Sequence, residues 1–158
     1  MLVAGLALKL HENNMNYHEV LLKQLIRDEG LVLHAYNDSL GYLTIGVGRL
    51  IDENKGGGIT REEAIYLLKN DILKHTQAVI NHLAWADIEV IGAVRFCALI
   101  NMHFQLGDNL FQFVNTLNFM KHGKWAEAAQ EMLKSLWAKQ TCARANRIAE
   151  QIRTNQWT

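Results

Sequence analysis

The chain has 158 residues, of which 49% are apolar, and its 16 Lys and Arg residues balance 16 Asp and Glu residues. This length allows one compact core and is too short for two full-sized independent domains. A formal net charge of zero argues against a protein whose main task is to bind the phosphate backbone of nucleic acids.

The N-terminal region contains an apolar run over residues 2–8, which is far shorter than the roughly 20 residues that span a bilayer. No basic stretch precedes the run and no small-residue cleavage site follows it, so we expect neither a secretory signal nor stable membrane insertion. The only cysteines are Cys97 and Cys142, too few for a disulfide framework, and we expect free thiols.

The first periodic element is a helix that runs from about Tyr17 to Glu29 and ends at Gly30. Two short β-prone runs follow, over residues 31–36 and 42–47. The turn-rich segment 37–41 separates them and predicts a hairpin. Glu29 is therefore expected at a helix end and Asp38 in the hairpin turn.

A long helix is predicted from residue 60 to about 82. Thr60 and Glu63 have the spacing of a capping box, in which each side chain satisfies a free backbone amide of the other residue. Because the chain has no proline, nothing obvious breaks this helix, which could join two lobes. The next predicted helices are an almost wholly apolar one over residues 94–106 and shorter ones over 115–121, 125–133 and 143–152. The fold class is α+β, mainly α.

Glu29 and Asp38 are candidates for the two carboxyl groups of glycoside cleavage. That reaction needs one acid to protonate the leaving oxygen and a second carboxylate to stabilise positive charge or activate water. Thr44, on the returning strand, could place a hydroxyl near the same water. The spacing alone is weak, because each acid could equally be a solvated turn or cap residue.

Three blocks of sequence resemble the phage lysozyme family, in the family's order, over roughly residues 15–158. The first runs from Asp28-Glu29-Gly30-Leu31 through Ala35-Tyr36-Asn37-Asp38 to Gly41-Tyr42-Leu43-Thr44-Ile45-Gly46-Val47-Gly48. The second is the segment 93–107, and the third begins at Trp125-Ala126-Glu127-Ala128-Ala129 and ends near Trp157. Residues 1–14 have no counterpart and form an N-terminal extension of unknown role.

The resemblance implies a bilobal lysozyme-like fold. It has a small β-hairpin lobe (about 15–59), a connecting helix (about 60–82) and a helical lobe (about 83–158). It implies hydrolysis of the β-1,4 bond between N-acetylmuramic acid and N-acetylglucosamine in peptidoglycan, with inversion. Glu29 matches the proton donor, Asp38 the second carboxylate and Thr44 the hydroxyl that orients water. Inversion implies a carboxyl separation of about 6.5 to 9.5 Å.

Further positions are carried over from the family. Arg144 matches a basic residue that pairs with the catalytic Glu, although a plain surface arginine is the alternative. The expected sugar contacts are Leu50, Phe104 and Thr116, with Gln105 and Trp137 lining the cleft. Phe104 and Trp137 could instead be ordinary core aromatics.

Several positions depart from the family pattern. Arg49 replaces a frequent His, and we expect it to pair with Asp71 in a bond that does not titrate near neutrality. Leu40 replaces an acidic neighbour of the catalytic Asp, and Glu131 stands where the family has an Asn near the saccharide. The segment 50–59 is shorter than in the family. The zero net charge predicts weaker long-range attraction to an anionic wall.

Two other functions stay open at this point. One is a lytic transglycosylase, in which a single Glu acts and the sugar's own hydroxyl closes an anhydro ring, although Asp38 and Thr44 argue against it. The other is a non-catalytic wall-binding module on the same scaffold. We expect no cofactor or metal, a monomer, peptidoglycan as the partner, and an endolysin held in the host cytoplasm until a holin releases it to the cell wall.

Overall fold

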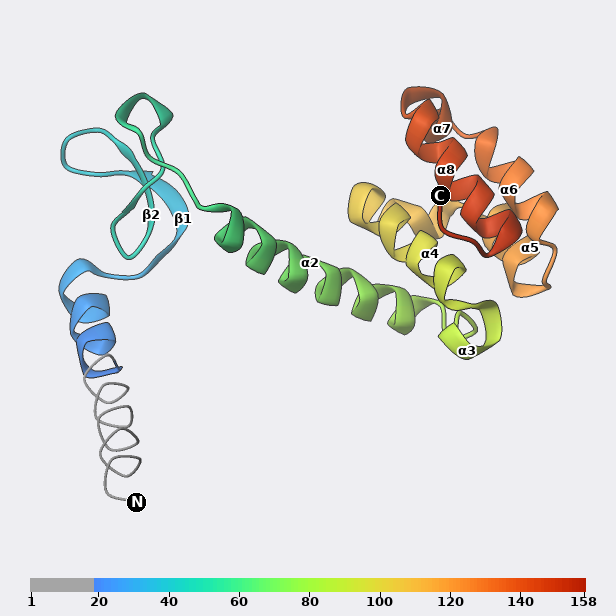
Figure 1. Ribbon diagram of the computed structural model, residues 1–158, viewed down its shortest axis with the longest axis horizontal. Helices are drawn as coiled ribbons and strands as arrows, with labels where there is room; N and C mark the ends of the chain where they lie inside the picture. Colours follow the sequence, from blue (N-terminus) through green and yellow to red (C-terminus); the bar gives the residue numbers. More distant parts are fainter. Residues whose placement is uncertain (1–18) are drawn as a thin grey trace, which may run out of the picture. The chain divides into compact units, whose positions relative to one another are not determined.

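The computed structural model describes residues 19–158, which form two compact units that divide inside a long helix, after Ala64. The first unit contains a helical segment over residues 19–29 and a three-stranded antiparallel sheet (Figure 1). The second unit is helical. These elements confirm the predicted mainly-α α+β class, whereas the N-terminal extension over residues 1–14 lies outside the described residues.

The sheet has the strand order β1-β2-β3. Strand β1 (Val32–Asn37) pairs with β2 (Leu43–Gly46), and β2 pairs with β3 (Arg49–Leu50), both antiparallel. Thr44 is the central residue of this arrangement, because it lies opposite Tyr36 on β1 and opposite Leu50 on β3. The predicted hairpin is confirmed to within one or two residues at each strand end, but the two-residue strand β3 was not predicted.

Helix α2 (Arg61–His82) begins at the predicted capping box. The backbone amide of Thr60 donates to Glu63 Oε2 at 2.7 Å, and the Glu63 amide donates to Thr60 Oγ1 at 3.2 Å. Two of the free amides at the helix start are thereby satisfied by neighbouring side chains. The predicted long helix is confirmed, with the 3₁₀ turn η1 (Glu53–Lys55) preceding it.

The helical unit is built around α4, α6 and α8. Helix α8 packs against α4, α6 and α7, and α5 packs against α6 (Figure 1). Leu99 and Met102 on α4 are fully buried, as the apolar pattern predicted. The remaining bounds are α3 (Ile88–Ile91), α4 (Ala93–Leu106), η2 (Gly107–Gln112), α5 (Val114–Lys121), α6 (Trp125–Leu133), α7 (Leu136–Gln140) and α8 (Cys142–Thr154).

The described part of the chain holds no helix with the length and apolar character needed to traverse a bilayer. Cys97 and Cys142 are free, as predicted.

Candidate functional site

Glu29 is the last residue of the helical segment 19–29. The helix ends there because Gly30 adopts a φ of 79°, which glycine reaches without steric cost, and its amide still donates to Ile26 O at 3.0 Å. The Glu29 carboxylate points toward the turn between β2 and β3. A Cβ built on Gly48 would lie 3.8 Å from Glu29 Oε2, so the missing side chain at Gly48 leaves open space beside this carboxylate.

Asp38 is fixed by the turn in which it lies. Its Oδ1 accepts hydrogen bonds from the amides of Leu40 at 2.9 Å and Tyr42 at 2.8 Å, and its own amide donates to Tyr42 O at 2.9 Å. Such local bonds are the reason aspartate favours tight turns. Within residues 19–158 no hydrogen bond reaches Oδ2, so that oxygen keeps its lone pairs for another partner.

Thr44 has 4% of its surface exposed, and its hydroxyl donates to Tyr42 O at 3.0 Å. The hydroxyl proton is therefore committed to the protein, and only the oxygen's lone pairs remain free to accept. Asp38 and Thr44 bond the two ends of the same residue, since one receives the Tyr42 amide proton and the other donates to its carbonyl. Tyr42 thus links two predicted site residues, a role that the sequence pattern did not single out.

These three residues share one compact unit, in which the helix end, the turn and the sheet position them. The chemistry available to such a set is proton donation by a carboxylic acid together with hydrogen bonding to a water by a carboxylate and a hydroxyl. The carboxyl separation of about 6.5 to 9.5 Å stays a prediction.

Three of the predicted sugar contacts lie in the helical unit, around the end of α4. Trp137 has 7% of its surface exposed and belongs to the core, and its indole Nε1–H donates to Gln105 Oε1 at 2.9 Å. Phe104 is 40% exposed and lines a hollow of 350 Å³ together with Cys97 and Arg144. Trp137 is therefore a buried core aromatic, whereas Phe104 is partly exposed at the edge of a hollow. Contact of either ring with a sugar stays a prediction.

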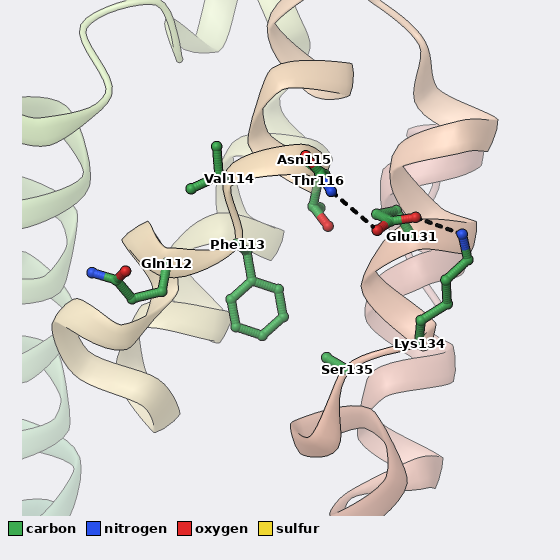
Figure 2. A pocket seen from close by; sticks show the side chains of 8 residues that line it. All are labelled: Gln112, Phe113, Val114, Asn115, Thr116, Glu131, Lys134 and Ser135. Carbon is green, nitrogen blue, oxygen red and sulfur yellow. Dashed lines mark hydrogen bonds and ion pairs between the residues drawn. The ribbon is translucent and has the colours of Figure 1, made fainter.

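A second hollow, of 310 Å³, lies between the start of α5 and the end of α6 and has both polar and apolar side chains in its lining (Figure 2). Thr116, one of the predicted sugar contacts, lines it. Glu131 accepts from Lys134 Nζ at 2.6 Å and from Asn115 Nδ2 at 3.4 Å. The bonds to Lys134 and Asn115 lower the pKa of the Glu131 carboxyl. The hollow therefore presents a carboxylate and an ammonium side by side, and Asn115 and Lys134 were not among the predicted site residues.

Arg144 contacts Asn101 in the structure. Its Nε and Nη2 donate to Asn101 Oδ1 at 2.9 and 2.7 Å, and Nη2 also donates to Asn101 O at 3.0 Å. The guanidinium is thereby held against α4 by a side chain 43 residues away, a distance at which sequence spacing gives no signal. Its predicted pairing with Glu29 joins residues of the two units and stays a prediction.

Arg49 pairs with Glu63, through Nη2 and Oε1, at the start of α2. The backbone bond from Thr60 is the largest contribution to a lowered pKa of the Glu63 carboxyl, and Arg49 adds to it. Asp71 was the predicted partner of Arg49. Because Asp71 belongs to the other unit, that pairing stays a prediction beside the observed one.

No group of three His, Cys, Asp or Glu side chains among residues 19–158 is arranged to hold a metal ion.

The family model described as "Phage lysozyme" matches residues 27–151, a span that contains Glu29, Asp38, Thr44 and Arg144. A probable T4-type lysozyme 1 of Dictyostelium discoideum is 33% identical over 84% of this chain and 94% of its own length. The endolysin of Salmonella phage P22 is 33% identical over 75% of this chain and 80% of its own length. The pre-baseplate central spike protein Gp5 of Enterobacteria phage T4 is 33% identical over 85% of this chain but only 28% of its own length.

The fold and these matches define a lysozyme-type glycosidase. The chain belongs to the phage lysozyme family, on its T4-like branch, and has a lysozyme-like, peptidoglycan-lytic function.

Proposed function

We propose that this protein hydrolyses the β-1,4 bond between N-acetylmuramic acid and N-acetylglucosamine, with Glu29 as the general acid and Asp38 and Thr44 holding the attacking water. The observation that carries the proposal is the asymmetry of Asp38. Two backbone amides fix Oδ1, while Oδ2 accepts no hydrogen bond within residues 19–158. A carboxylate held this way can accept a proton from water without losing its position.

Thr44 would orient the same water by accepting its second proton. Its hydroxyl proton is already donated to Tyr42 O, so the oxygen can offer only lone pairs. A water that donates to both Asp38 and Thr44 has its own lone pair directed elsewhere, toward the sugar carbon it attacks. The open space at Gly48 leaves room beside Glu29 for the leaving oxygen.

Attack by water on the face opposite the leaving group inverts the anomeric centre. We therefore expect α-configured reducing ends immediately after cleavage, which proton NMR of a fresh digest would detect. Anhydro-sugar ends in the mass spectrum would instead identify the transglycosylase. β-Configured ends would indicate a covalent intermediate and contradict the water-holding role of Asp38.

The decisive variant is Glu29→Gln, which keeps the shape of the side chain and removes the acid. Loss of a general acid costs a factor of about 10² to 10⁴ in rate. We expect a loss of that size in a turbidity assay on permeabilised cells, with an unchanged unfolding temperature. The matched control is Glu19→Gln, on an exposed residue of the same helical segment, which should retain full activity. A Glu29→Gln variant as active as the parent would remove the basis of the proposal.

Leu50, Phe104, Gln105, Thr116 and Trp137 are proposed to form the substrate-binding surface, with Arg144 as support for Glu29. The hollow at Thr116 carries both an anionic and a cationic group, and so fits a substrate with both charges better than a neutral glycan. Glu131→Gln should then raise KM for peptide-bearing peptidoglycan. KM for peptide-free glycan chains should change little.

We propose an endolysin role for the chain, in which it acts on the cell wall as a monomer and leaves the host cytoplasm through a holin. The endolysin names of two relatives support this role, whereas another relative is a spike protein. Expression in a bacterial cytoplasm should leave cells intact until a holin is co-expressed. Lysis without a holin would contradict this release route.

A further inference from the structure

Two histidines meet where α2 passes α4, and the proposed function uses neither of them. The Nδ1 atoms of His75 on α2 and His103 on α4 are 2.7 Å apart, and the ring centroids are 4.9 Å apart. His103 has only 5% of its surface exposed. Phe104 and Phe111 pack against these rings. A polar bond between two titratable groups thus joins the two helices beside two phenylalanine rings.

The gap between the two nitrogens has room for a single proton. On its other side, His103 Nε2 lies 3.3 Å from a carboxylate oxygen of Asp108, which can only accept. This contact assigns a proton to Nε2 of His103, so that Nδ1 of the neutral ring is an acceptor. His75 must then donate from Nδ1. The two hydrogen bonds therefore point the same way: His75 donates to His103, and His103 donates to Asp108.

We propose that His75 and His103 form a pH-sensitive latch that holds α2 to α4 and opens when both rings are protonated. A first added proton can enter at Nε2 of His75 and leaves the shared bond intact. A second must enter at Nδ1 of His103, and two N–H groups then face each other across 2.7 Å. Two cations in contact, with the bond between them lost, favour separation of the helices.

The surrounding charges support this order of events. Burial lowers the pKa of His75, and His103 and Lys74 lower it further, against an opposing effect of Asp71 on the same helix. The charged group from η2 is Asp108, which faces His103 from the side away from His75. Because the folded protein disfavours protonation, the unfolded chain binds more protons below the ordinary histidine pKa of 6.5. The latch is therefore closed above that pH and weakens as the pH falls below it.

The test is amide hydrogen exchange of the full chain at about pH 7.5 and about pH 5, corrected for intrinsic rates. Between these two pH values, protection of residues 72–79 of α2 should fall. The fall should be about tenfold for each unit by which the folded protein lowers the pKa of His75 from its ordinary value. His75→Gln keeps a donor toward His103 but cannot titrate, so it should retain protection at both pH values. His122→Gln is the matched control, since His122 caps α5 through Asn118 O at 2.8 Å, and it should behave as the parent.

Nitrogen NMR of the parent provides a second readout that needs no substitution. It should show His75 protonated at Nδ1 and His103 at Nε2 above neutrality, with the His75 ring titrating below the ordinary histidine pKa of 6.5. The proposal is overturned if His75 titrates at or above the ordinary histidine pKa of 6.5, or if His75→Gln loses protection with acid as the parent does. Neither readout involves lytic activity, so this inference can fail while the proposed function stands.

Discussion

The two units of this chain hold their residues in place by different means. In the first, the candidate carboxylate Asp38 is fixed by hydrogen bonds from close neighbours in sequence, the amides of Leu40 and Tyr42. In the second, every member of the buried apolar cluster lies between Val79 and Ile152, and its contacts join distant segments. Substitution of Asp38 should therefore affect activity, whereas truncation of a buried apolar side chain in the second unit should affect the folding free energy.

The largest effect is expected for Asp38→Asn. The Asn Oδ1 can still accept from both amides, so the turn keeps its geometry while the negative charge is lost. We expect a rate loss of about 10² to 10⁴, measured by turbidity. The free energy of unfolding should stay within about 0.5 kcal/mol of the parent value.

Asp38→Ala is the companion variant. It removes the acceptor as well as the charge, and should cost about 1 kcal/mol of stability in addition to the activity. If Asp38→Asn destabilised the protein as much as Asp38→Ala, the turn bonds would not be what holds this residue.

For Ile152→Ala in the helical unit we expect a loss of stability without a loss of activity, the opposite of Asp38→Asn. Ile152 is fully buried, and truncating such a side chain costs about 2 to 5 kcal/mol, because a cavity remains. Urea unfolding would measure the loss, while the turnover of folded protein should be unchanged. Val90→Ala is the control, since Val90 is 75% exposed and should cost little. A loss of turnover at full folding would show that the two units are not energetically separate.

The sequence also predicts the structure of the first unit better than that of the second. The reason is the distance along the chain between the residues that interact. The capping box of Thr60 and Glu63 and the turn at Asp38 involve residues up to four positions apart, and both were predicted. Helices α3 and α7 were missed, because four or five residues are too few to show a helical period.

Side-chain partners far apart in sequence could not be predicted at all. His75 meets His103 across 28 residues, and Arg144 meets Asn101 across 43. No periodicity encodes such pairs, since they depend on how the helices cross. The roles of Glu29, Asp38 and Thr44 came from the family resemblance, because acids nine residues apart carry little information alone.

A glycine pair compares the units directly. Gly30 and Gly92 have similar φ values, 79° and 88°, but a Cβ on Gly92 would lie 2.3 Å from Asn155 Nδ2, whereas Gly30 has open space. Gly92→Ala should cost about 2 to 3 kcal/mol, from backbone strain and displacement of Asn155. Gly30→Ala should cost about 1 kcal/mol, from backbone strain alone.

The readouts are urea unfolding for both variants and turbidity for Gly30→Ala, whose neighbour is Glu29. Adding Asn155→Gly to Gly92→Ala should recover part of the loss, since Asn155 itself has a φ of 58° that glycine adopts freely. Equal costs at the two glycines would show that the contact with Asn155 is unimportant.

The smallest effect concerns Arg49, whose exposed pair with Glu63 contributes little to stability. Arg49→His should make stability depend on pH near neutrality, because a carboxylate beside an imidazole raises its pKa above the ordinary value of about 6.5. The added stability is then fully present below that value and is lost as the pH rises through the raised pKa. Thermal unfolding at a series of pH values would measure it.

Further substitutions in the Arg49→His variant would identify which carboxylate pairs with residue 49. If Glu63 is the partner, Glu63→Gln added to Arg49→His should abolish the pH dependence and Asp71→Asn should leave it unchanged. The reverse result would favour the pairing with Asp71 and would mean that the two units meet at this point. Arg49→His without any pH dependence near neutrality would contradict both pairings, because either carboxylate must raise the pKa of an imidazole that it contacts.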